Sequence, residues 1–79
     1  MEKVKIPSHF AIIQNREYVL ELQSKYHFWR ITQGDKFFIL AHKYRISDAY
    51  HKQRIATDPQ ALIRYIVCHD NAFERRLKS

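Results

Sequence analysis

The stretch WRITQGDKFFIL, residues 29–40, decides the fold because it places a turn dipeptide between two apolar and aromatic runs. Glycine in first position suits a two-residue type II′ turn, since glycine accepts the positive φ that this turn requires. We therefore predict a β-hairpin that turns at Gly34-Asp35. The predicted register pairs Ile31 with Phe38, Trp29 with Leu40 and His27 with His42, and on the other face Thr32 with Phe37, Arg30 with Ile39, Phe28 with Ala41 and Tyr26 with Lys43.

The residues before this hairpin also alternate like a strand. One face of the extended chain carries Tyr18, Leu20 and Leu22, and the other carries Glu17, Val19 and Glu21. A tight turn at Ser24-Lys25 would bring the apolar set opposite His27, Trp29 and Ile31, so this face is the predicted core. The first strand, about residues 9–14, is expected to turn Phe10 and Ile12 toward the same core.

The C-terminal third predicts an amphipathic helix over about residues 59–77. It starts with Asp58 as the N-cap and Pro59 at the first helical position. Its apolar stripe consists of Leu62, Ile63, Ile66, Val67, Phe73 and Leu77. Asp70 falls within the stripe, which leaves two interpretations. Either the helix is interrupted there and Asn71 caps a second piece, or Asp70 is buried with a polar partner.

These elements predict one α+β domain of 79 residues. We expect an antiparallel four-stranded meander, packed on one face by the C-terminal helix. Residues 1–7 form a lead-in, residues 9–45 the strands, and residues 46–57 a basic connector. Within the connector, a short helix capped by Ser47 and a fifth, edge strand over residues 53–56 both remain open.

Cysteine content and hydropathy favour a cytoplasmic protein that does not enter the membrane. Cys68 is the single cysteine, so an intramolecular disulfide framework is excluded. The N-terminus lacks the apolar run of a signal peptide, and no apolar stretch reaches the roughly 18 residues of a membrane span.

The charge balance favours polyanionic partners. Fourteen Lys and Arg residues oppose eight Asp and Glu residues, which gives a net charge of +6. Such an excess attracts nucleic acid or an acidic protein surface.

The sheet face turned away from the core is the main candidate site. On the predicted register it combines aromatic rings with cations, and the connector adds further positive charge. Rings stack on exposed bases and cations neutralise phosphates, as single-stranded nucleic acid requires. The predicted nucleic-acid-binding residues are Tyr26, Phe28, Arg30, Phe37, Lys43, Arg45, Lys52 and Arg54. The alternative is that the helix or a second subunit covers this face.

The histidines give a weaker signal. His27 and His42 face each other in the predicted hairpin, with His9 as a possible neighbour. Two imidazoles without a cysteine or carboxylate at ligand spacing favour a structural pair, so we predict neither a metal nor another cofactor. Cys68-His69-Asp70 is not a catalytic trio, because successive helical side chains point about 100° apart.

One limited resemblance bears on function. The segments Trp29-Arg30-Ile31 and 38–44, followed by a basic run and a proline-started helix, resemble the sheet of RelE/HigB-type toxin ribonucleases over about half the chain. The N-terminal helices of that family have no counterpart here, so no catalytic residue is carried over.

The sequence thus predicts a small nucleic-acid-binding accessory or regulatory module, with single-stranded nucleic acid as its partner. A protein-interaction module is the alternative, either a homodimer or an inhibitor of a nucleic-acid enzyme. A metal-independent ribonuclease is the third possibility.

Overall fold

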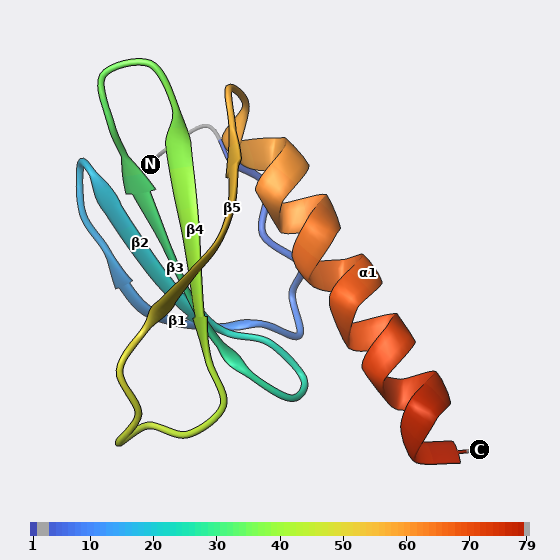
Figure 1. The fold of residues 1–79 in the computed structure, drawn as a ribbon. Coiled ribbons are helices and arrows are strands. Elements are labelled where there is room, and N and C mark those ends of the chain that lie inside the picture. Colours follow the sequence, from blue (N-terminus) through green and yellow to red (C-terminus); the bar gives the residue numbers. More distant parts are fainter. Residues whose placement is uncertain (2–3, 79) are drawn as a thin grey trace.

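The computed structural model describes residues 1 and 4–78, which form five strands followed by one helix (Figure 1). The elements are β1 Ala11–Asn15, β2 Val19–Gln23, β3 Phe28–Gln33, β4 Phe38–Lys43, β5 His51–Ala56 and α1 Pro59–Lys78. Each strand pairs antiparallel with the next, in the order β1-β2-β3-β4-β5. The predicted α+β meander is confirmed, and the fifth strand is present.

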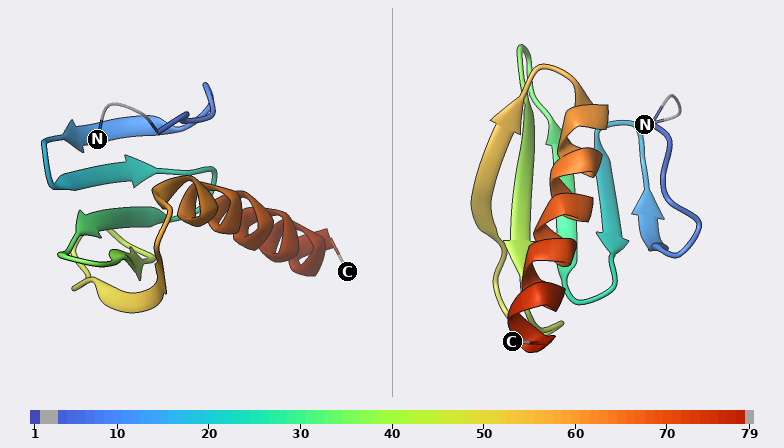
Figure 2. Two further views of the ribbon diagram at one scale, coloured as in Figure 1. Left: turned by 90° about the horizontal axis from the view of Figure 1, so that it is seen from above. Right: turned by 90° about the vertical axis from the view of Figure 1, so that its right-hand side faces the viewer.

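The molecule has two layers, because α1 lies across one face of the open sheet (Figure 2). The core fills the space between them and consists of Phe10, Leu20, Leu22, Trp29, Ile31, Leu40, Leu62, Ile63 and Ile66. Each such side chain contributes roughly 1.5–3 kcal/mol when fully removed from water. The predicted core residues of the central strands and of the helix stripe therefore meet in one cluster.

Both hairpin turns lie one residue later than predicted, which shifts the pairing register by two residues. The Gly34 N–H donates to the Phe37 carbonyl oxygen at 2.8 Å, so the turn is formed by Asp35-Lys36 rather than by Gly34-Asp35. No described residue has a positive φ, which excludes the type II′ turn. At the preceding hairpin, the Ser24 N–H donates to the His27 carbonyl oxygen at 3.0 Å, so the turn lies at residues 25–26.

The predicted register is therefore wrong, although the predicted faces of the central strands are right. Trp29 pairs with His42 and Ile31 with Leu40 between β3 and β4, and Leu22 pairs with Trp29 between β2 and β3. Side chains alternate with a period of two along a strand, so a shift of two residues leaves each side chain on its original face.

The sheet edge at β1 departs from the prediction. Phe10 is buried as expected, whereas Ile12 is 53% exposed and Tyr18 is 56% exposed. The ladder between β1 and β2 is irregular between Ile12 and Gln14, and α1 leaves this edge uncovered (Figure 2). Placing Ile12 and Tyr18 in the core was therefore wrong.

The N-terminal segment packs beside the helix rather than remaining a separate lead-in. The Lys5 backbone N–H donates to the Gln60 side-chain oxygen at 2.8 Å, and the Gln60 side-chain nitrogen donates to the Lys5 carbonyl at 2.9 Å. Val4 and Ile6 pack against the core. The segment around Lys5 is therefore anchored to the first turn of α1.

Both open questions of the C-terminal half are settled. Residues 51–56 form the edge strand β5, and the short helix after Ser47 is absent. α1 begins as predicted, with the Asp58 carboxylate accepting from the Gln60 N–H at 3.0 Å, and it continues without interruption through Asp70. Asn71 therefore caps no second piece. Within the described residues, no helix combines the length and apolar character needed to cross a membrane.

Asp70 is buried because the β2–β3 turn supplies its partners. Its carboxylate accepts from the Ser24 hydroxyl at 3.0 Å and from the Lys25 backbone N–H at 3.1 Å. The Ser24 oxygen also accepts from the Trp29 indole N–H at 2.8 Å. This network joins α1 to the β2–β3 turn, beside the apolar contacts that Ile66 makes in the core.

Candidate functional site

The sheet face opposite α1 is the first candidate site, and we call it the open face. The strand register lays three rows of side chains across it. The central row is Gln14, Glu21, Arg30, Ala41 and Lys52; one flanking row is Gln23, Phe28 and Lys43, and the other is Val19, Thr32, Ile39 and Ile55. Cations, rings and aliphatic groups thus share a surface that the helix does not cover.

Tyr50, from the segment between β4 and β5, lies over the middle of this surface. The Arg30 guanidinium is 4.6 Å from the centre of the Tyr50 ring, and the Lys43 ammonium is 4.4 Å from it. The Tyr50 hydroxyl donates to the Glu21 carboxylate at 3.3 Å. Burial, together with the Glu21 charge, raises the pKa of Tyr50 to about 12, so the phenol stays a neutral donor at physiological pH.

Phe28 completes a group of two rings and two cations. The Lys43 ammonium is 5.7 Å from the centre of the Phe28 ring, and its nitrogen also donates to the Ile46 carbonyl at 3.0 Å. Phe28, Arg30, Lys43 and Tyr50 are all half-buried. We call these four residues the cation–aromatic group; it offers flat surfaces for stacking and charges for anions, with Glu21 as an acidic neighbour.

Four of the eight predicted nucleic-acid-binding residues lie together on the open face: Phe28, Arg30, Lys43 and Lys52. Arg45 is exposed in the adjoining segment after β4. Phe37 is 47% exposed at the β3–β4 turn. It lines a shallow groove with Ile39 at the start of β4, away from Lys43 at the end of that strand.

Two of the predicted residues, Tyr26 and Arg54, lie on the helix side; the placement of Tyr26 on the outer face was wrong, whereas Arg54 was expected in the basic connector. The Tyr26 ring packs against Phe73 of α1 at 4.9 Å, and its hydroxyl donates to Glu74 at 3.1 Å. Arg54 pairs with the core residue Leu40, and its guanidinium lies 4.9 Å from the Tyr65 ring of α1. The register shift moved Tyr26 into the turn, which tilts it toward the helix.

Sequence reasoning missed Tyr50, because it falls in the segment whose structure was left open. Once β5 is known, the position of Tyr50 directly before this edge strand indicates that its side chain can fold back over the sheet and belong to the site. The hydroxyl of this residue joins the connector to β2 through Glu21.

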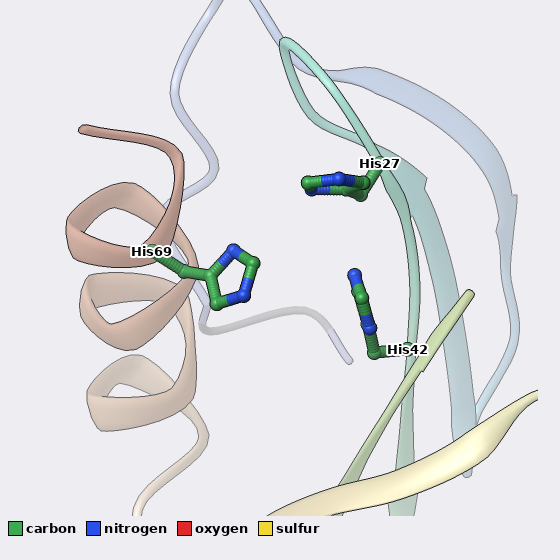
Figure 3. Close-up of side chains that lie close together, drawn as sticks. All are labelled: His27, His42 and His69. Atoms are coloured by element: carbon green, nitrogen blue, oxygen red, sulfur yellow. The ribbon is translucent and has the colours of Figure 1, made fainter. Parts of the chain in front are cut away.

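The second candidate site is a cluster of three histidines between the sheet and α1 (Figure 3). His27 precedes β3, His42 belongs to β4 and His69 to α1. Their ring centres are 4.8 Å (His27–His42), 5.4 Å (His27–His69) and 5.2 Å (His42–His69) apart. The predicted His27–His42 proximity is present, although His42 pairs with Trp29 in the ladder, and His9 instead stacks edge-on against Phe10 at 4.8 Å.

The environment keeps these imidazoles neutral at physiological pH. Burial, followed by the neighbouring His27 and His69, lowers the pKa of His42 to about 4. Burial also lowers the pKa of His27 and of His69. As expected, the sequential trio at residues 68–70 does not converge, since Cys68 is exposed and Asp70 bonds to the β2–β3 turn.

Comparison with protein-family models, with curated proteins and with solved structures finds no match to this chain. Its function must therefore be argued from its own residues.

Proposed function

We propose that this protein binds single-stranded nucleic acid through the open face of its sheet. The observation that supports the proposal is the cation–aromatic group on a face that α1 leaves uncovered. Flat rings stack with bases of any sequence, at about 1–3 kcal/mol per base, and nearby cations neutralise the backbone.

The arrangement of charge around the group fits an extended strand of phosphates. Lys52 lies in the same cross-strand row as Arg30, and Arg45 is exposed in the segment that follows Lys43. With Lys43, these residues provide four cations along one side of the sheet. Long, flexible lysine and arginine side chains can turn from the rings toward phosphates while a base takes their place on Phe28 or Tyr50.

The proposed partner is single-stranded because a flat sheet reaches base faces only when the bases are unpaired. Stacking on a sheet surface requires bases that are splayed out of a helix, which single strands provide at little cost. Among residues 1 and 4–78, no helix projects from the open face to enter a groove of duplex DNA.

Fluorescence anisotropy with labelled mixed-sequence DNA and RNA of about 16 nucleotides tests the proposal, since this length spans a typical site. Four phosphate contacts predict a slope of log K against log salt of about −3. Phe28→Ala should weaken binding by roughly 5- to 100-fold, which corresponds to one lost stacking contact. Arg30→Ala should weaken binding and make the salt slope shallower.

Arg54→Ala is the matched control for Arg30→Ala. It removes the same charge from the helix side of the sheet, where the guanidinium lies over Tyr65. Its binding should stay close to that of the unaltered protein. Equal losses for the two variants would show attraction to net charge without a site, and the absence of binding at low salt would exclude the proposal.

Self-association is a second candidate, favoured by the aliphatic end of the same face. Ile55 is 45% exposed and Phe37 is 47% exposed, and both lie beside Ile39. Apolar groups gathered on a sheet surface are typical of subunit contacts. Light scattering tests this candidate: a dimer mass that Ile55→Asp returns to the monomer value supports it, and a monomer mass at all concentrations excludes it.

A further inference from the structure

The three-histidine cluster has a feature that packing alone does not explain. His27 Nδ1, His42 Nε2 and His69 Nδ1 are all buried, and none has a hydrogen-bond partner among the described residues. A buried polar atom without a partner is costly, and apolar side chains at these three positions would avoid the cost. The chain instead brings together, from three separate elements, three histidines that each carry an unsatisfied nitrogen.

We propose that His27, His42 and His69 form a binding site for a divalent first-row transition metal of the zinc type. One nitrogen from each residue lies within 4.8 Å of the other two. The three rings approach from the β2–β3 turn, from β4 and from α1, so they surround a common point rather than line one wall (Figure 3).

The distances require little rearrangement. Zinc holds histidine nitrogens at about 2.1 Å, and tetrahedral geometry then separates the nitrogens by about 3.4 Å. Starting from separations of at most 4.8 Å, each nitrogen must move by no more than about 0.8 Å toward the centre. Small rotations of the imidazole rings supply this movement without displacing a strand or the helix.

The chemistry of the donors selects the metal class. Imidazole nitrogen suits Zn²⁺, Cu²⁺ and Ni²⁺, whereas Mg²⁺ and Ca²⁺ prefer oxygen ligands. The nearby carboxylate of Asp70 is already occupied by the Ser24 hydroxyl and the Lys25 N–H. The proposed site therefore has three neutral protein ligands, and its fourth position is left to water or to an exogenous anion.

The surroundings orient the rings and limit access. The Trp29 ring lies 4.4 Å from that of His42 and 5.0 Å from that of His69. Tyr44, which is 61% exposed, lies over His27 at 4.7 Å and His42 at 4.6 Å between ring centres. Phe73 covers His27 from the helix side at 4.7 Å. This aromatic shell keeps the rings in place and leaves Tyr44 as the side chain between the cluster and solvent.

Titration of Zn²⁺ into the chelator-treated full-length protein tests the proposal by calorimetry. We expect one Zn²⁺ per chain and a rise in Tm on binding, because a ligand that binds the folded state stabilises it. His69→Ala should weaken binding by more than about 100-fold, since loss of a direct ligand exceeds the 10- to 100-fold effect of losing an outer-shell partner. His9→Ala is the matched control, because His9 lies outside the cluster against Phe10 and its loss should leave the affinity unchanged.

A measurement on the unaltered protein keeps the proposal falsifiable if His69→Ala fails to fold. In NMR spectra, Zn²⁺ should shift the imidazole signals of the three cluster histidines and leave those of His9 unchanged. Absence of a one-to-one Zn²⁺ event, or shifts confined to histidines outside the cluster, would overturn the proposal. So would a folded His69→Ala variant that binds Zn²⁺ as tightly as the unaltered protein.

Discussion

The two faces of the sheet use aromatic and polar residues in opposite ways. On the covered face, Trp29 is fully buried and its indole N–H ends a network that runs through Ser24 to Asp70. On the open face, the Tyr50 ring remains half-buried and is contacted by cations that also meet solvent. Buried polar groups need fixed partners, whereas those at the surface can exchange partners with water or a ligand. The covered face is therefore expected to determine stability and the open face to determine nucleic-acid binding.

The largest expected loss of stability is that of Trp29→Ala, and its neighbour in β3, Phe28, provides the comparison. Trp29→Ala should lower the free energy of unfolding by about 4 kcal/mol, because it leaves a large cavity and removes the partner of Ser24. Phe28→Ala, one residue away on the open face, should cost less than about 1 kcal/mol. Urea denaturation of both variants gives the comparison, and equal losses would contradict the division between the faces.

Asp70→Asn should lower the free energy of unfolding by about 2 kcal/mol. The substitution removes the charge that strengthens the bonds from Ser24 and Lys25, and it replaces one acceptor oxygen with a donor. Urea denaturation again measures the loss. The exposed Asp48→Asn serves as the control, and a change of less than about 0.5 kcal/mol at Asp70 would show that the buried network contributes little.

Mild acid should destabilise the metal-free protein through the covered face. The pKa of His42 lies at about 4 in the folded chain, below the ordinary value of 6.5, so the unfolded chain binds more protons at intermediate pH. Stability is therefore full above about pH 6.5 and is lost as the pH falls toward 4. In the presence of a chelator, we expect Tm to fall by about 10 °C between pH 7 and pH 5.

The variant His42→Phe tests whether this pH dependence of Tm comes from His42. His42→Phe keeps a ring at the position and removes its titration, so its Tm should vary less over the same range. His9→Ala should retain the slope of the unaltered protein. A slope that is unchanged in His42→Phe would assign the titration to other groups, such as His27 and His69, whose pKa values burial also lowers.

The smallest expected effect is on the open face. Tyr50→Phe removes the hydroxyl that bonds to Glu21 and keeps the ring in contact with the two cations. It should cost about 0.5 kcal/mol in urea denaturation, since a half-buried hydrogen bond contributes little net stability. Nucleic-acid affinity should persist, because the ring remains. A loss of more than about 2 kcal/mol would show that the open face also supports the fold.

The two layers and most of the covered face could be predicted from the sequence. The register error was two residues, and a shift of two residues leaves each strand side chain on the same face. Moving the turn from Gly34-Asp35 to Asp35-Lys36 shifted the register by two residues and kept Trp29 and Leu40 facing the helix. The same shift affected Tyr26, because it moved this residue out of the strand and into a turn against α1. Residues near turns are therefore where the prediction failed.

The candidate sites depended on contacts between elements that alternation does not encode. His69 lies at helical spacing with Leu62, Ile66 and Phe73, on the apolar face of the helix. The sequence could therefore have shown that its side chain points toward the sheet. Its meeting with His27 and His42 could not be predicted, because that requires the height at which α1 crosses the sheet. Asp70 left two interpretations for the same reason, since its partner lies 46 residues away at Ser24.

The absence of any described residue with positive φ has a practical consequence. The turn at residues 35–36 uses negative φ angles, which every L-amino acid can adopt, although proline is limited by its fixed φ and missing N–H. The turn therefore does not require glycine or asparagine. This hairpin end lies far along the sheet from the three-histidine cluster and from α1's buried network. It is a position at which a foreign peptide could be displayed, or a reporter group attached, with the rest of the domain serving as a rigid carrier.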